Sequence, residues 1–190
     1  MVSDLQKQIE FIKAIDALKS VQRKTYLIDE SRMENSAEHS WAVATFALVL
    51  KDYAPAEVDV MKVIQMLLLH DIVEIDAGDT FLYDVALTDT KVQRENEAAD
   101  RLFGILPAKQ AAEFRSLWDE FEAEQTAESV FATGLDRLIP LVHNIATKGR
   151  AWKELGVSYE QILAKNQKIA KANPILWEYI KTEIDGLFGH

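Results

Sequence analysis

One short segment of the chain, MLLLHDIVEIDAGD, carries the residue types best suited to chemistry. His70 and Asp71 lie in the most apolar run of the sequence, which we predict to be a buried helix. Glu74 follows one helical turn later, on the same face. Burying an unpaired carboxylate is costly, so these acidic side chains need a cation or strong hydrogen-bond donors. Imidazole and carboxylate ligands without thiolate suit a divalent ion such as Mn, Co, Fe, Ni or Zn.

Further ligands would have to come from other parts of the chain. His39 lies in the first turn of another predicted helix, although a lone buried histidine is more often a core residue than a ligand. Asp136 lies in the apolar stretch GLDRLIPLV, and Pro140 cannot donate a helical hydrogen bond to its carbonyl. This marks either a ligand position or a simple kink. His143, on the same face as Asp136, could be an extra ligand, but a supporting or core position is favoured.

Composition excludes several classes of protein. The chain has 190 residues, of which 48% are hydrophobic and 27% charged, as in one ordinary globular domain. It has no cysteine, which excludes disulfides, thiolate zinc sites and a cysteine nucleophile. Its net charge of −10 argues against a nucleic-acid polymer as partner. Without a recognisable leader or a long apolar run, we expect a cytoplasmic protein with no membrane contact.

Helical periodicity dominates the sequence. The first helix begins after Ser3, a good N-cap, and the polar stretch 20–33 is predicted to be a loop. Asn35 and Glu38 form a capping-box pattern that starts a helix running to about Tyr53. Later helices are predicted at residues 56–75, 91–106, 108–123, 126–148, 158–171 and 175–188, with Pro55 in the first turn of 56–75 and Gly78 after its end. We therefore predict an all-α single domain over residues 1–190, with about seven to eight helices.

The order of these residues matches a known pattern. His39, the His70–Asp71 doublet and Asp136, all on predicted helices, resemble the HD-domain superfamily of metal-dependent phosphohydrolases. The segments RMENSAEHSW, LLLHDIVEIDAGDT and GLDRLIPLVHNIATKG resemble its branch of bacterial 5′-deoxynucleotidases and their eukaryotic relatives, over a core of about residues 18–177. The resemblance implies a helical HD domain that binds one divalent cation (Mn, Co, Fe, Ni, Zn or Mg) and forms a homodimer.

The resemblance also implies roles for other residues. Glu74 corresponds to the residue that handles the nucleophilic water, Asp79 to the one that meets the sugar hydroxyl, and Arg23 to a phosphate-binding residue. We assign Thr80, which completes the same GDT motif, to substrate binding as well. The deoxynucleotidases carry Arg-Trp where this chain has Arg23 and Lys24. A flexible lysine side chain cannot exclude the ribose 2′-hydroxyl as a tryptophan indole does. We therefore expect weaker selection of deoxyribose over ribose than in relatives with Arg-Trp.

The predicted function is a 5′-nucleotidase that releases phosphate from (deoxy)ribonucleoside 5′-monophosphates. Two alternatives stay open: an HD hydrolase acting on another nucleotide, such as an alarmone or a cyclic nucleotide, and a non-catalytic nucleotide or metal sensor. Glu74 favours an enzyme, because a binding module has no need of a general base beside the metal. The short segment 78–90 leaves little room for a second phosphate arm and favours monophosphates.

Overall fold

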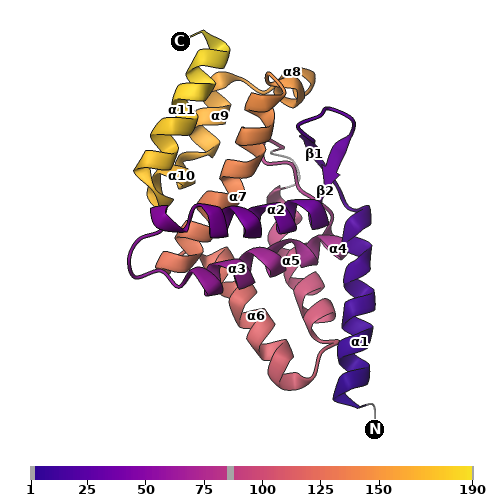
Figure 1. Ribbon diagram of the computed structural model, residues 1–190. Coiled ribbons are helices and arrows are strands. Elements are labelled where there is room, and N and C mark those ends of the chain that lie inside the picture. The colour runs from indigo at the N-terminus through magenta and orange to yellow at the C-terminus, as the bar shows by residue number, and fades with distance from the viewer. Residues whose placement is uncertain (1–2, 85–87, 190) are drawn as a thin grey trace.

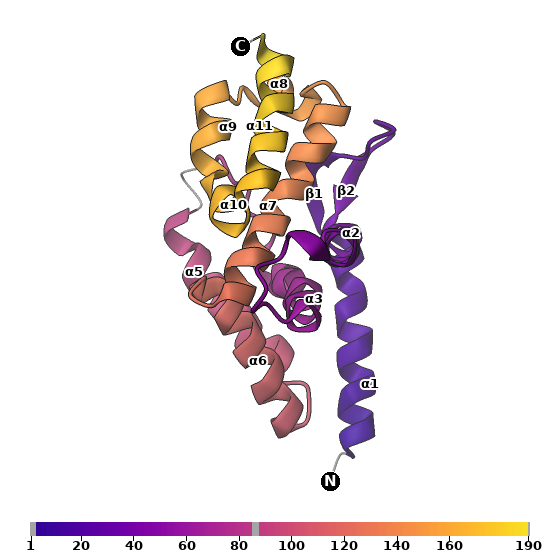
Figure 2. The same ribbon diagram turned by 60° about the vertical axis from the view of Figure 1, so that its left-hand side comes forward.

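The computed structural model describes residues 3–84 and 88–189 (Figure 1). Helices account for most of these residues, which confirms the predicted all-α class. The first is α1 (Asp4–Ile15), which Ser3 caps by accepting a hydrogen bond from the Gln6 backbone N–H. The N- and C-termini lie at opposite ends of the molecule in Figures 1 and 2. Among the described helices, none has the length and apolar character needed to cross a bilayer.

The stretch predicted as a loop is instead a β-hairpin, so that prediction was wrong. After a short 3₁₀ turn (Asp16–Ser20), β1 (Gln22–Tyr26) pairs antiparallel with β2 (Met33–Asn35). The inward-facing side chains of the hairpin are polar, Thr25 and Glu34 among them. A strand that buries polar residues lacks the apolar alternation from which strands are recognised.

The next elements carry the predicted chemistry. The predicted capping box of Asn35 and Glu38 is present and starts α2 (Ser36–Val49), which a 3₁₀ turn (Lys51–Tyr53) follows. The helix expected at 56–75 is divided into α3 (Val60–Leu69), a 3₁₀ turn (His70–Val73) and α4 (Glu74–Ala77), which ends at Gly78 with φ of 75°. Asp59 rather than Pro55 starts α3, because its side chain accepts from the next backbone N–H groups. The backbone thus tightens where the His-Asp doublet begins.

The rest of the described chain is also helical, as α5 (Thr88–Phe103), α6 (Ala108–Ala123), α7 (Ala127–Ala146), α8 (Arg150–Leu155), α9 (Tyr159–Lys165), α10 (Gln167–Ala172) and α11 (Pro174–Phe188). The described residues hold eleven α-helical segments, more than the seven to eight expected. Two predicted helices are divided, at His70 and at Asn166. The short α8 was missed because six residues between two left-handed glycines show no clear periodicity.

Helix α7 is the central element of the fold (Figures 1 and 2). It packs against α2, α3, α6, α10 and α11. Gly134 allows the close approach of α10, because a Cβ atom there would lie 2.2 Å from the Cβ of Ala172. The apolar core around α7 contains Val43, Val63, Met66, Leu67, Phe131, Leu135, Ile139 and Ile180. A second core, between α1, α5 and α6, contains Phe11, Leu69, Ile72, Leu102, Phe103 and Trp118. The His-Asp doublet lies where α3 leaves the first core for the second.

Candidate active site

Three side chains from separate elements bring potential metal-ligating atoms together. His39 comes from α2, His70 from the 3₁₀ turn after α3, and Asp136 from the middle of α7; one ligand atom from each lies within 4.8 Å of the other two. Oδ1 of Asp136 lies 2.9 Å from Nε2 of His39 and 3.5 Å from Nε2 of His70. Although burial opposes ionisation, these imidazoles hold the pKa of Asp136 well below its usual range. The three residues therefore converge on one buried point, as the sequence predicted.

The donor set of this group fits a cation. Nδ1 of His70 donates to the Leu67 carbonyl at 2.8 Å, which leaves Nε2 as the nitrogen that would bind a metal. That Nε2 atom is buried, lacks a hydrogen-bond partner among the described residues, and faces Oδ1 of Asp71 at 3.1 Å. Burial disfavours a charged imidazole, but Asp71 and Asp136 outweigh it and raise the pKa of His70 to about 9. A divalent ion would take the place of the proton on Nε2 and would bind the carboxylates as well.

Asp71, the fourth predicted ligand, lies at the edge of this group. Its Oδ1 faces His70, whereas its Oδ2 accepts a hydrogen bond from Nη1 of Arg23 at 2.9 Å. The same Nη1 atom lies 3.9 Å from both Glu74 and Asp79, and Nε of Arg23 lies 3.5 Å from Glu34. Burial opposes the charge of Arg23, but Asp71, Glu74, Asp79 and Asp136 raise its pKa above the ordinary value. Arg23 is thus surrounded by four carboxylates.

Glu74, the predicted general base, is buried at the first position of α4. Its Oε2 accepts a hydrogen bond from the Ser36 hydroxyl at 2.6 Å, which fixes the orientation of the carboxylate. Burial raises the pKa of Glu74 well above its usual range; the charge of Asp71 adds to this shift and Arg23 opposes it. A raised pKa makes this carboxylate a stronger base than an ordinary glutamate, as a general base requires.

Glu34 and Ser36 are site residues that sequence reasoning missed. Glu34 is 1% exposed, with Oε1 lying 3.5 Å from Nδ1 of His39 and Oε2 lying 3.7 Å from Nδ1 of His143. His143 therefore lies beside Glu34, outside the three-ligand group, in the supporting position that was favoured. Both missed residues precede His39 in the segment MENSAEH. Recognising β2 would have drawn attention to Glu34, whereas Ser36 is the first residue of α2, directly after the capping residue Asn35.

Two cavities meet at this site. The larger, of about 260 Å³, is lined by His70, Asp71 and Glu74, and the smaller, of about 70 Å³, extends toward Trp152. Both are lined by Arg23, Asp79, Thr80, Asp136 and Arg137, and Lys24 lines the smaller cavity. The structure thus brings every predicted substrate-binding residue to the wall of a cavity beside the ligand cluster. Arg137 is a further lining residue that the sequence did not single out.

Comparisons with known proteins agree with this arrangement. The model of the HD domain family matches residues 15–177. Human 5′-deoxynucleotidase HDDC2 is 28% identical over 130 residues, which cover 68% of this chain and 62% of the human protein. The Dictyostelium discoideum 5′-deoxynucleotidase HDDC2 is 26% identical over 139 residues, covering 70% and 73% of the two chains. The match thus spans less than two thirds of the human relative.

Solved structures extend the comparison to the whole fold. A crystal structure of a predicted metal-dependent phosphohydrolase from Magnetospirillum magnetotacticum is 46% identical, with a TM-score of 0.95, and covers 99% of this chain and 96% of that one. An HD-domain phosphohydrolase from Listeria innocua, at 17% identity and a TM-score of 0.59 over 95% and 85% of the chains, shares the fold. With most of its length matched by the family model and its histidines and aspartates gathered at one buried point, this chain belongs to the HD domain family.

Proposed function

We propose that this chain is a metal-dependent 5′-nucleotidase that releases phosphate from (deoxy)ribonucleoside 5′-monophosphates. The observation that carries the proposal is the buried group of His39, His70 and Asp136 with the carboxylate of Glu74 beside it. The names of the relatives, 5′-deoxynucleotidase and metal-dependent phosphohydrolase, support the same reaction class.

We propose that His39, His70, Asp71 and Asp136 hold one divalent cation, drawn from Mn, Co, Fe, Ni, Zn or Mg. A bound divalent cation offsets negative charge on a phosphate oxygen and makes water more acidic. The buried Nε2 of His70, which faces two carboxylates without a hydrogen-bond partner among the described residues, supports this ligand set.

Glu74 takes the proton of the attacking water in this proposal. The Ser36 hydroxyl occupies Oε2, so Oε1 is the atom left to accept a proton. Its position on the wall of the larger cavity, together with a pKa that burial raises, supports this role. General-base catalysis of this kind typically contributes about 10²–10⁴ in rate.

The substrate would lie across the junction of the two cavities. Asp79 and Thr80 line both cavities and are placed to meet the sugar. Arg23 lies between Asp79 and the ligand cluster, and Lys24 lies beside it on the wall of the smaller cavity. This lining supports a phosphate and a sugar bound side by side, as in a nucleoside monophosphate.

A phosphate-release screen tests the proposed function. The substrates are all ribo- and deoxyribonucleoside 5′-monophosphates, cyclic nucleotides and an alarmone, each with several divalent metals and with Glu74→Gln as the control variant. We expect release from the monophosphates by the wild-type chain and little by the variant. Turnover confined to cyclic nucleotides or the alarmone, or nucleotide binding without turnover, would instead support the alternative hydrolase or the sensor.

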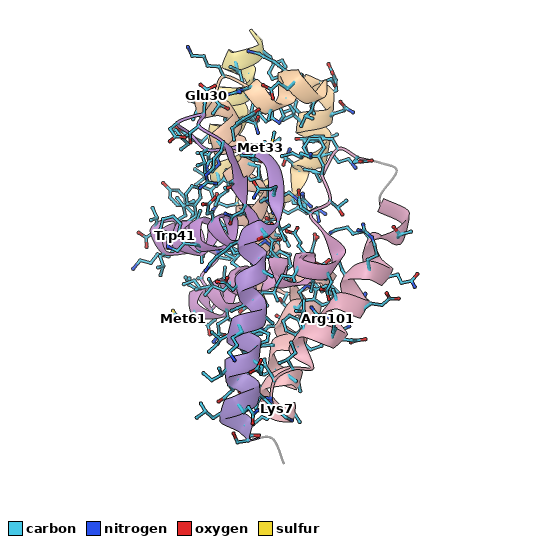
Figure 3. All side chains as sticks on the ribbon, turned by 90° about the vertical axis from the view of Figure 1, so that its right-hand side faces the viewer. Lys7, Glu30, Met33, Trp41, Met61 and Arg101 are labelled. Atoms are coloured by element: carbon cyan, nitrogen blue, oxygen red, sulfur yellow. The ribbon has the colours of Figure 1, made fainter. Side chains whose placement is uncertain are left out.

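We also propose that residues 1–190 form a single domain, with its core at about 18–177, which acts as a homodimer in the cytoplasm on free nucleotides. Exposed apolar side chains on α2 and α3 support a self-association surface: Trp41, Leu48, Met61 and Leu68. Trp41 and Met61 lie at the same edge of the molecule in Figure 3. Light scattering on the wild-type chain and on Trp41→Ser tests this; a monomeric wild type would contradict it.

A further inference from the structure

Five basic side chains line the larger cavity: Arg23, Lys91, Arg137, Lys165 and Lys168. Three of them are already neutralised by carboxylates. Arg23 has its four acidic neighbours, Lys91 lies 3.3 Å from Glu95, and Lys168 is paired with Glu124. An anion that enters the cavity must compete with these carboxylates for each of the three cations, which weakens what they can offer it.

Arg137 and Lys165 have no ion-pair partner among the described residues. Lys165 is exposed on α9, so its flexible ammonium is strongly hydrated. Arg137 is half-buried on α7, and its Nε atom is buried without a hydrogen-bond partner in the described part of the chain. Leaving a buried N–H unsatisfied is costly, and proteins rarely do so away from a ligand site. Arg137 therefore has hydrogen-bonding capacity that the described residues leave unused.

The position of Arg137 indicates what it would bind. It directly follows Asp136, and it lines both cavities together with Asp79 and Thr80. It thus lies at the junction where the ligand cluster, the general base Glu74 and the sugar-contacting segment meet. A guanidinium presents a planar fork of N–H groups that matches two phosphate oxygens.

We propose that Arg137 binds the dianionic phosphate of the substrate at this junction, alongside Arg23. The inference rests on the proposed function, since it assigns a residue to the phosphate of a nucleoside monophosphate. It adds a second cation to the phosphate-binding role that the resemblance implies for Arg23, whose charge is shared among Glu34, Asp71, Glu74 and Asp79.

The test compares Arg137→Gln, Arg137→Lys and wild type in two measurements. Calorimetric titration with inorganic phosphate measures phosphate binding directly. Inhibition of nucleotide hydrolysis by the dephosphorylated nucleoside measures binding to the rest of the site. We expect Arg137→Gln to weaken phosphate binding and raise KM by about 10–100-fold, as for loss of a charge-assisted hydrogen bond. We expect Arg137→Lys to weaken both less, with nucleoside competition unchanged in either variant. Arg101→Gln, on exposed α5 and paired with Asp76, is the matched control.

Two outcomes would overturn the inference: wild-type phosphate affinity in Arg137→Gln, or an equal loss of nucleoside and phosphate binding. If Arg137→Gln does not fold, Arg137→Lys tests the proposal instead, because an ammonium cannot supply the planar fork of N–H groups. Unchanged phosphate affinity in Arg137→Lys would then contradict the proposal. If the wild-type chain hydrolyses no nucleotide, the proposed function fails, but calorimetry with phosphate still tests Arg137 by itself.

Discussion

Two regions of this molecule are equally buried and chemically opposite. In the apolar core around α7, Val63, Leu67 and Ile180 are at most 1% exposed and lie among other hydrocarbons. In the polar layer of the site, formed by Arg23, Glu34, His39 and His70, Glu34 and His39 are buried to the same extent but carry atoms without hydrogen-bond partners among the described residues. The first arrangement stabilises the fold by removing apolar surface from water. The second costs stability, which indicates that it is kept for chemistry.

The unsatisfied atoms show how strongly the two regions differ. In the polar layer they include Nε of Arg23, Oε1 of Glu34, Nδ1 of His39 and Nε2 of His70. Buried polar groups without partners are rare in native structures, so several within one layer call for a ligand. We therefore expect variants in the polar layer to lose activity and variants in the apolar core to lose stability.

The largest effect should come from Asp136→Asn, which removes the charge that both imidazoles face. We expect the metal content to fall from about one ion per chain to nearly none, and activity to be lost with it. Elemental analysis of gently purified protein measures this. Asp52→Asn, at an exposed position, is the control and should retain the metal. Full metal occupancy in Asp136→Asn would show that the ion lies elsewhere.

Glu74→Gln should keep the metal, but its kcat should fall by about 10²–10⁴-fold, because the amide cannot accept the proton of water. Phosphate release and elemental analysis on the same sample distinguish loss of the base from loss of the ion. Glu97→Gln, exposed on α5, should be as active as wild type. Wild-type turnover in Glu74→Gln would mean that Glu74 has a structural role only.

The apolar core should respond in the opposite way. Ile180→Ala on α11 should lower the free energy of unfolding by about 2–5 kcal/mol, because it leaves a cavity in a close-packed core. Its folded fraction should bind metal and turn over like wild type. Ile175→Ala, on an exposed position of the same helix, should change stability by less than about 0.5 kcal/mol. Urea denaturation measures the free energy of unfolding of both variants. Equal losses of stability in the two would contradict the expected difference between the buried and the exposed position.

Sugar selection should respond more weakly. Lys24→Trp should raise the ratio of kcat/KM for deoxyribo- over ribonucleotides by roughly tenfold, since an indole on the cavity wall would exclude the 2′-hydroxyl. Lys24→Met, which removes the charge without adding a wall, is the control. A wild-type ratio as high as that of an Arg-Trp relative, measured side by side, would show that another residue selects the sugar.

The smallest effect concerns the stability cost of the polar layer. Burial raises the pKa of Glu74 in the folded protein, so the unfolded chain releases this proton more readily and stability falls as pH rises above the ordinary glutamate range. Glu74→Gln should therefore raise the Tm of the metal-free protein at pH 7 by about 2–4 °C. The gain should shrink as the pH is lowered and Glu74 becomes protonated. A Tm below that of wild type at pH 7 would contradict this account.

Several features could be predicted from the sequence because they depend on neighbours along the chain. The caps at Ser3 and Asn35 are hydrogen bonds across three residues, and Gly78 ends its helix through its own backbone freedom. The residue types of His70, Asp71 and Glu74 in one apolar segment indicated a cation site, because buried carboxylates need a cation or strong hydrogen-bond donors. Local patterns thus determined most helices and the chemical character of the site.

Only the tertiary structure decided which of these groups meet. His39 and Asp136 are 97 residues apart in sequence and Arg23 and Asp71 are 48 apart, yet each pair lies 2.9 Å apart in space. Glu34 is a site residue because the β-hairpin packs against α2. The hairpin has no apolar alternation, so no local sequence pattern predicts this packing. Burial and charge compensation depend on every element that packs around a side chain. For that reason residue types could be recognised from sequence, whereas their partners were decided by the packing of α7 against α2 and α3.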